Sequence, residues 1–362
     1  MPGDLPRTCL PVIYPRDDEA VTLQVSRGAL IKLGLGIIVT VTCLYFVLSS
    51  VKFDELLREL SRIQPSYILA ALASLSIGYA LRITRWWVML SACAAQVAWR
   101  SCVSPYLASI ALNNVLPFRA GDVIRAFAFP AAIGVSRAQS LATLIFERVL
   151  DLAFLLGLLT IGLISLPDAV LPAWLQTAIQ FVLGATALAL IICFAGHSIL
   201  SRFLNDLAEK SALGRITPLR SLLSFGSMTL DEIGRLSRGG RFLEIIGLSA
   251  GIWVFEAGVF ASVLYGLGTD VGAAGAALVT GMATIATLAP SSPGYFGPFH
   301  LAAFESCKLL FDNTERAAAI AVLSHAMIWL PMTLAGLISL LFIRKRRWIA
   351  DPDIQTMEHT HD

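Results

Sequence analysis

The chain has 362 residues, of which 56% are hydrophobic and 14% are charged, and its mean hydropathy is +0.74. Soluble globular proteins carry about 25% charged residues, so this composition excludes an ordinary cytosolic enzyme. The net charge of +2 says little by itself. A helix needs about 20 apolar residues to cross a bilayer, and the chain has several such runs. We therefore expect an all-α, polytopic membrane bundle.

Six apolar runs are long enough to be expected as membrane spans. They are Ala29–Ser50, a run beginning at Tyr67–Leu81, Leu141–Leu166, Leu171–Ala195, Phe242–Leu267 and Ala319–Ile343. Residues 1–28 are polar and are expected to form a cytoplasmic tail, residues 29–347 a transmembrane domain, and residues 348–362 a C-terminal tail. The second run continues into Arg82 and Arg85 beside two tryptophans, a combination typical of a membrane–water boundary.

Two further apolar regions are short and interrupted by proline and glycine. The first is Ser104–Val115, and the second is Val271–Leu288, which is followed by the short piece Phe299–Phe311. Broken backbone at membrane depth persists only where it is buried in protein or lines a wet cavity. We expect these regions to be broken helices or re-entrant loops in a bundle of 6–8 spans. Their breaks contain Pro117, Gly121, Pro290, Pro293, Gly294 and Gly297.

The distribution of lysine and arginine predicts the orientation in the membrane. The segment Gly196–Arg241 contains seven arginines and lysines, whereas the turn Pro167–Pro172 contains none. Short cytoplasmic loops are enriched in these residues, so residues 196–241 are expected to form a basic cytoplasmic loop, with both termini on the same side. Apolar residues among its cations fit either an amphipathic helix on anionic lipid or a solvated linker.

The sequence lacks the motifs that mark soluble catalytic domains. Its one G-x-S-x-G match, Gly247–Gly251, lies inside an expected span, where small residues serve helix contact rather than the strand-to-helix turn of a nucleophile. The five histidines and six cysteines are scattered, without the spacing of a zinc site. We expect no metal, no cofactor and no nucleic-acid partner.

Charged and amide side chains gather after the first short apolar region, at Asn113, Asn114, Arg119, Asp122 and Arg125. A charge at the bilayer centre costs about 2.5–3.5 kcal/mol on insertion scales, so such a cluster needs an explanation. Guanidinium groups bind phosphate in a two-pronged fashion, which favours a lipid head-group site. The alternative is an interfacial loop whose arginines contact lipid phosphates without selectivity.

A second charged cluster, Glu147, Arg148 and Asp151, lies inside the third expected span. Residues three and four apart share a helix face, so Arg148 can neutralise one carboxylate while the other pairs with an arginine of the first cluster. This arrangement predicts an ion network at the site or, alternatively, a purely structural tie between helices. Glu256, midway along the fifth span, is expected to be protonated or paired with an arginine.

Three other features of the sequence also suggest roles. Arg82 and Arg85 are interpreted either as snorkelling anchors or as the lining of a cytoplasmic mouth that gathers anionic head groups. His325, in the last span, is expected to be a hydrogen-bonded packing residue. The Pro290–Pro298 break has two interpretations. Its free backbone N–H groups could bind an anion, and the break would then form one half of a site where two interrupted segments meet. The alternative is an ordinary loop between helices.

In combination these motifs resemble the lysylphosphatidylglycerol synthase transmembrane-region family, whose members are flippase-like membrane proteins. The resemblance covers roughly residues 30–345. It implies an all-helical bundle that moves or presents anionic or isoprenoid lipids, and some relatives accompany glycosyltransferases or envelope-lipid enzymes. Relatives that aminoacylate lipids carry an additional soluble transferase domain, and we expect this chain to represent the membrane part alone. The motifs are Asn113-Asn114-x-x-Pro117-x-Arg119-x-Gly121-Asp122-x-x-Arg125, Gly134-Val-Ser136, Glu147-Arg148-x-x-Asp151, Pro293-Gly294-x-x-Gly297 and the early basic motif Arg82-x-x-Arg85-Trp86.

These observations favour a translocator of anionic or isoprenoid-linked lipid in the inner membrane. Arg119 and Arg125 are expected to hold the head-group phosphate. A second hypothesis is a membrane-embedded transferase that modifies a lipid head group, with Asp122 or Glu147 as general base. A third is an accessory subunit that docks a glycosyltransferase or envelope-lipid enzyme through the basic loop between Arg202 and Arg241.

Overall fold

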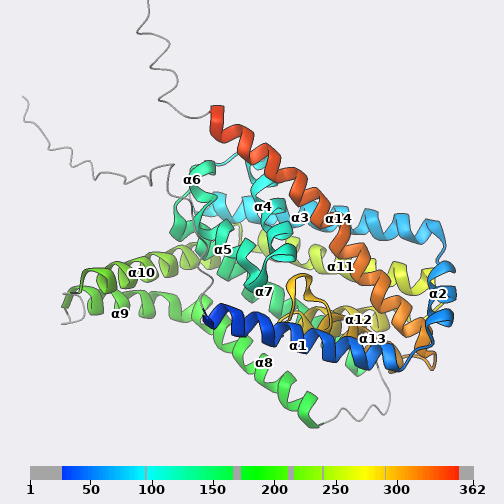
Figure 1. Cartoon of the computed structure of the whole chain (residues 1–362). Coiled ribbons are helices and arrows are strands. Elements are labelled where there is room, and N and C mark those ends of the chain that lie inside the picture. Colours follow the sequence, from blue (N-terminus) through cyan, green and yellow to red (C-terminus); the bar gives the residue numbers. More distant parts are fainter. Residues whose placement is uncertain are drawn as a thin grey trace, which may run out of the picture.

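Over the residues that it describes, the computed structural model contains helices and no strand, so the all-α prediction is confirmed (Figure 1). The described residues are 27–93, 96–165, 173–210, 216–238, 240–289 and 291–349. The longest helices are α1 (Arg27–Ser49), α3 (Pro65–Ala92), α7 (Arg137–Ile164), α11 (Phe242–Gly266) and α14 (Thr314–Ile349). The other α-helices are α2 (Phe53–Ser61), α4 (Trp99–Val115), α5 (Ala120–Phe127), α6 (Pro130–Ile133), α8 (Ala173–Ile191), α9 (His197–Lys210), α10 (Thr217–Arg238), α12 (Gly272–Ala286) and α13 (Pro298–Lys308).

Four described stretches of helix are long and apolar enough to cross a membrane. They are α3, the stretch Leu183–Glu209 in α8 and α9, α11, and Thr314–Ile343 in α14. A fifth candidate is the pair Gly34–Ser49 and Phe53–Ser61, which is bent by 87°. The chain is thus a polytopic membrane bundle, as expected. The number of crossings stays a prediction, and so does the division into an N-terminal tail, a transmembrane domain and a C-terminal tail. Some predicted features lie outside the described residues, namely Pro290, the turn Pro167–Pro172 and most of both tails.

Close helix pairs form the frame of the bundle. The helix α3 runs along α11, α4 runs along α14, and α12 lies between α7 and α13. Small residues permit these approaches, as in other membrane bundles. A Cβ on Gly336 of α14 would lie 2.2 Å from the carbonyl oxygen of Leu107, and a Cβ on Gly162 of α7 would lie 2.6 Å from the Cα of Leu278.

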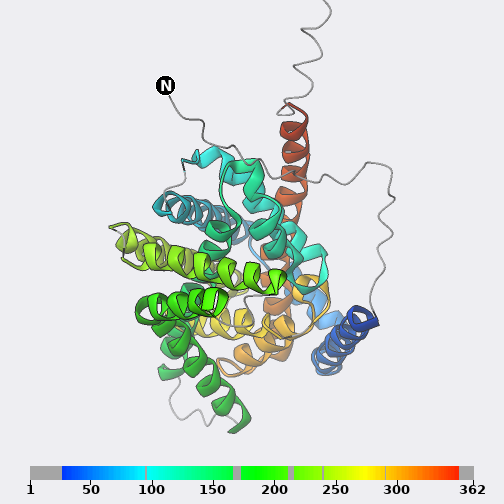
Figure 2. The ribbon, with the colours of Figure 1, turned by 90° about the vertical axis from the view of Figure 1, so that its left-hand side faces the viewer.

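The helices α9 and α10 form a hairpin that packs on α7 and extends at one end of the bundle, the end that faces the viewer in Figure 2. On α10, Ile233 and Leu236 are buried in a core cluster with Trp86 of α3. Ile233 and Leu236 therefore face protein, whereas Leu222 on the same helix is exposed. For the exposed face, the two sequence interpretations, an amphipathic helix on anionic lipid and a solvated linker, stay predictions.

The helix α3 does not end where the basic motif suggested a membrane–water boundary. It continues to Ala92, and both Arg85 and Trp86 are fully buried inside the protein. The interpretation of Arg85 as a snorkelling anchor is therefore wrong, because its guanidinium is surrounded by other helices. The fourth predicted span also differs at its end. From Ile192 to Gly196 the helix continues as a π-helical turn into α9.

The first break separates α4 from α5. Leu116 is extended, Pro117 follows, and Phe118 and Arg119 both adopt positive φ angles of 62° and 52°. Two consecutive left-handed residues turn the chain back, so α5 lies against α4. Gly121 permits this contact, because a Cβ there would lie 1.9 Å from the carbonyl oxygen of Ser109.

The second break lies between α12 and α13 and is held by α1. A short 3₁₀ turn spans Pro293–Tyr295, with Gly294 and Gly297 at φ angles of 80° and 92°. The hydroxyl of Thr40 on α1 accepts a hydrogen bond from the backbone N–H of Ser292 at 3.0 Å and donates to the carbonyl of Phe296 at 2.9 Å. This one threonine therefore ties an otherwise largely exposed helix to the break.

Candidate functional site

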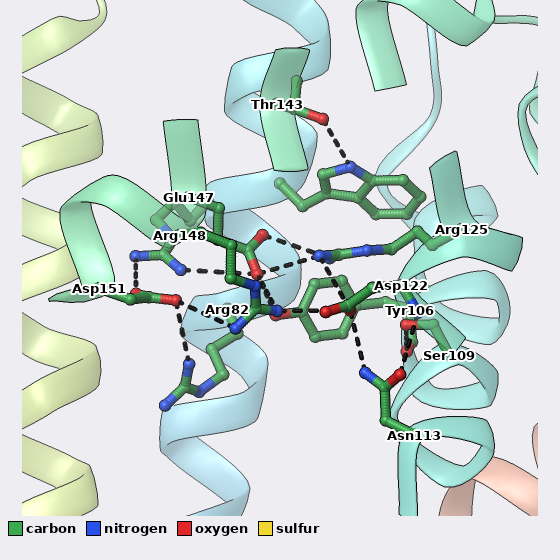
Figure 3. A network of polar contacts seen from close by, with 12 residues as sticks. Arg82, Tyr106, Ser109, Asn113, Asp122, Arg125, Thr143, Glu147, Arg148 and Asp151 are labelled. Carbon is green, nitrogen blue, oxygen red and sulfur yellow. Dashed lines mark hydrogen bonds and ion pairs between the residues drawn. The ribbon is translucent and has the colours of Figure 1, made fainter. Parts of the chain in front are cut away.

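Five arginines and four carboxylates gather between the first break and the helices α3, α5, α7 and α11, close to the second break. Figure 3 shows the part of this network that contains Arg82, Asp122, Arg125, Glu147, Arg148 and Asp151. Charges from such distant parts of the chain come together because broken and crossing helices bring them to one depth in the bundle. Within the described residues, each carboxylate has a nearby arginine, and the pairs can be matched one to one. The set consists of Arg82, Arg85, Arg119, Arg125, Arg148, Asp122, Glu147, Asp151 and Glu256.

Arg125 and Glu147 form a two-pronged pair at the back of the network. The guanidinium of Arg125 donates to both carboxylate oxygens of Glu147, at 3.2 and 3.1 Å, and both side chains are at most 1% exposed. The ring of Tyr106 packs on the Arg125 guanidinium at 4.7 Å. Arg148 donates to the same carboxylate at 3.2 Å. The sequence prediction that an arginine of the first cluster meets a carboxylate of the second is confirmed by this contact.

Arg82 and Arg85, one turn apart on α3, connect that helix to α7 and α11. Arg85 donates to Asp151 at 2.7 Å and to the Ser249 hydroxyl at 2.9 Å. Arg82 donates to Glu256 at 3.0 Å, which agrees with the expectation that Glu256 pairs with an arginine. Buried charges need such partners, because removing an ion from water costs several kcal/mol.

Asp122 joins the first cluster to the second. Its carboxylate accepts from the Asn113 amide at 3.0 Å and from Arg148 at 3.4 Å. Asn113 in turn accepts from the backbone N–H of Asp122 at 3.0 Å, so the two side chains lock α4 to α5. Asn114 points to another helix and donates to Thr333 of α14 at 2.9 Å.

Arg119 differs from the other four arginines, because no described carboxylate lies within ion-pair distance of it. Its guanidinium donates to the carbonyl and hydroxyl oxygens of Thr287, at 3.3 and 3.2 Å. It also lies 5.4 Å from the ring centroid of Tyr295. These neutral partners leave its positive charge uncompensated. Arg119 therefore carries the unmatched charge of the cluster.

A cavity of about 290 Å³ joins the two broken regions. Its charged wall consists of Arg82, Arg119, Asp122, Arg148, Asp151 and Glu256, and its remaining wall includes both asparagines and several aromatic rings. Arg85, Arg125 and Glu147 are buried behind this wall. Most of the charged residues singled out in the sequence thus surround one space, in two layers.

A second cavity of about 490 Å³ lies next to the first, between α1 and the two breaks. The two cavities share Asn113, Arg119, Thr287, Leu288 and Tyr295. The second one is lined mainly by apolar side chains, of which the most exposed are Leu35, Leu116, Phe118 and Leu288. We call the first space the inner cavity and the second the outer cavity. Pro117, Pro293 and Gly294 line the outer cavity.

Several residues of the site were missed by the sequence interpretation. Thr287, at the end of α12, carries no signal that distinguishes it from other threonines in apolar helices. Trp253 stands three residues before Glu256, so its place on the same helix face could have been predicted; its ring lies 5.6 Å from the Arg82 guanidinium. His325 was expected to be a packing residue, and it contacts the Gly294 carbonyl at 2.8 Å among aromatic rings.

Comparison with known proteins gives a family match over most of the chain. Residues 33–336 match the model of the lysylphosphatidylglycerol synthase TM region. A similar curated protein is the glycosyltransferase AglD of Haloferax volcanii, 26% identical over 328 residues, which cover 81% of this chain and 51% of AglD. The chain spans about half the length of that relative. The protein is an integral membrane protein that belongs to the lysylphosphatidylglycerol synthase transmembrane-region family.

Proposed function

We propose that the protein translocates a lipid with an anionic head group across its membrane, with the head group passing through the inner cavity. The observation that carries this proposal is a cavity walled by arginines and carboxylates, with one unmatched arginine, inside an otherwise apolar bundle. A polar head group that leaves water for hydrocarbon loses its hydrogen bonds at a cost of several kcal/mol. A cavity of this composition replaces those bonds while the hydrocarbon chains stay in the bilayer.

The roles of the charged residues follow from their contacts. Arg119 binds the head-group phosphate, and Asn113, Asn114 and Asp122 fix the first break around it. Arg82 and Arg148 complete the cationic wall. The buried residues behind the wall hold α3, α5 and α7 together, and they need not touch the lipid; they are Arg85, Arg125 and Glu147.

The two breaks act as gates on either side of the site. Interrupted helices that meet at the midplane are a recurring arrangement in transporters. The residues that give these segments their turns are Pro117, Gly121, Pro293, Gly294 and Gly297. We propose an inner-membrane location. The lysine and arginine distribution supports an orientation with both termini and the α9–α10 hairpin in the cytoplasm.

The test is a leaflet-resolved assay in liposomes. Purified protein is reconstituted with fluorescent phosphatidylglycerol, and the fraction of label that an impermeant quencher reaches is followed over time. We expect Arg119→Ala to abolish translocation and Arg58→Ala, on the exposed face of α2, to retain it. Circular dichroism and gel filtration establish that both variants are folded. Translocation at the wild-type rate by Arg119→Ala contradicts the proposal.

A second candidate is an accessory subunit for a glycosyltransferase, supported by the similarity of this chain to about half of the glycosyltransferase AglD. In that case a separately encoded glycosyltransferase copurifies with this chain, and Leu222→Asp on the exposed face of α10 disrupts the complex while Arg119→Ala does not. If Arg119→Ala disrupts the complex and Leu222→Asp does not, this role is excluded.

A head-group transferase is less favoured, because both candidate bases, Asp122 and Glu147, are paired with arginines.

A further inference from the structure

The charges around the inner cavity define the kind of head group that it accepts. Asp122 pairs with Arg148, Glu147 with Arg125, Asp151 with Arg85 and Glu256 with Arg82, at distances of 3.4 Å or less. Five arginines and four carboxylates therefore leave one positive charge, on Arg119. We infer that the lipid carries one phosphate charge and an uncharged head group, and that aminoacylated lipids, which bear ammonium groups, are excluded. This inference rests on the proposed function and narrows its substrate class.

No described carboxylate around the inner cavity is without a guanidinium, since each of the four contacts at least one arginine. An amine that binds there therefore competes with an arginine for a negative charge that is already neutralised. Arg119 also lies on the cavity wall, and its charge, which no described carboxylate pairs with, repels an ammonium where water is scarce. The cavity therefore discriminates by the sign of the charge.

The outer cavity provides the complementary half of the site. Arg119 lies on the walls of both cavities, at their junction. Exposed apolar side chains surround the outer one, including Leu35 from α1 and Phe118 beside the arginine. A lipid is itself divided into a polar head and a hydrocarbon chain by its phosphate. The arrangement matches a phosphate at Arg119, the head group in the inner cavity and the first part of a chain in the outer cavity.

The inner wall suits an uncharged group that bears hydroxyls. Tyr79, Tyr106 and Trp253 line it with aromatic surface, and Asn113 and Asn114 add amides. Amides both donate and accept hydrogen bonds, as do the hydroxyls of a glycerol or a sugar. Binding sites of this kind combine aromatic surface with a few polar groups that fix orientation. A glyceryl or glycosyl phosphate is therefore the expected head-group chemistry.

A competition assay tests this inference without any transport step. The purified protein in detergent micelles is loaded with fluorescent phosphatidylglycerol, which is then displaced by unlabelled phosphatidylglycerol or by lysyl-phosphatidylglycerol. The two competitors differ only in the lysyl ester and its two ammonium groups. We expect phosphatidylglycerol to displace the probe at a concentration at least tenfold lower. Equal or better displacement by the lysyl lipid overturns the inference.

Charge reversal at Arg119 sharpens the test. In Arg119→Glu the excess charge becomes negative, and the preference is expected to change in favour of the lysyl lipid. Arg119→Gln replaces the guanidinium with a shorter, uncharged amide and is expected to remove most of the discrimination, which provides a readout if the glutamate variant does not fold. A preference that is the same in wild type and Arg119→Gln contradicts the inference.

The binding and transport experiments can fail separately. Selective binding of phosphatidylglycerol without transport in liposomes contradicts the proposed translocation and supports the inferred head-group selectivity. Transport of phosphatidylglycerol and of its lysyl ester at equal rates supports translocation and contradicts the charge selection. Translocation and substrate class are thus decided by different measurements.

Discussion

The guanidinium of Arg119 lies 5.4 Å from the ring centroid of Tyr295, and each residue belongs to a different break in the bundle. Both have positive φ angles, 52° and 62°, although neither is glycine. Left-handed backbone at such residues costs about 1–3 kcal/mol each and persists where the surrounding structure enforces it. Two strained segments thus meet at the junction of the two cavities, where the unmatched arginine is located.

The buried carboxylate of Glu147 is expected to be needed for stability as well as for the site. Glu147→Gln leaves Arg125 and Arg148 short of a negative charge, and loss of one partner of a buried pair costs about 3–5 kcal/mol. The matched control is Glu305→Gln, which breaks an exposed pair with Lys308 and is expected to cost less than about 1 kcal/mol. Thermal unfolding in detergent measures both. Equal unfolding temperatures of the two variants contradict the prediction.

Arg82 and Glu256 are expected to be coupled energetically. Either Arg82→Met or Glu256→Gln alone leaves one charge without its 3.0 Å partner, so each single variant is destabilised. The double variant removes both charges and retains the other three pairs, so part of the loss is recovered. We expect a coupling of about 0.5–3 kcal/mol from a double-mutant cycle on unfolding. Additive effects would show that the two side chains are independent.

Gly121 is expected to tolerate no side chain. In Gly121→Ala the added Cβ collides with the carbonyl of Ser109, so α5 must move from α4 and the contacts between Asn113 and Asp122 loosen. Lower thermal stability and slower translocation are the expected results. Gly247→Ala on α11 is the control, because nothing lies within 4 Å of a Cβ there, and alanine favours a helix by up to about 1 kcal/mol. A stable, active Gly121→Ala variant refutes the prediction.

The orientation of the chain is testable by cysteine labelling. In a background in which the six native cysteines are replaced by alanine, Ser221→Cys on α10 is expected to react with an impermeant maleimide only after the cells are permeabilised. Ser61→Cys on α2 follows the first predicted span, which begins at the predicted cytoplasmic N-terminal tail, so this position is expected to lie outside and to react in intact cells. Both positions are exposed. Labelling with the reverse pattern shows that the lysine and arginine distribution misassigned the two sides.

The parts of the site that were predictable share a helix or a short break. Asp151 lies three residues after Arg148 and four after Glu147, so helical geometry alone places it beside them, and the structure has all three on one helix. The need of a buried carboxylate for a cation predicted a contact with the first cluster, which Arg125 makes. The all-helical membrane bundle followed from the length of the apolar runs.

The parts that were not predictable depend on contacts between distant segments. Arg85 was interpreted as an interfacial residue because tryptophans follow it, yet Asp151 and Ser249 surround it. The same local pattern occurs at membrane boundaries, so only the packing of α3 against α7 and α11 distinguishes the two cases. Arg119 could not be identified as the unmatched arginine, because that requires knowing the partners of all the others.

The one-to-one matching of acids and arginines has a consequence for related sequences. If either member of the pair Arg82 and Glu256 is lost during evolution, the other remains as an uncompensated charge inside the bundle, so we expect relatives to gain and lose the two together. Arg119 has no such acidic partner. Its replacement is expected to follow a change in the lipid that a relative carries, which makes this position an indicator of divergence in specificity.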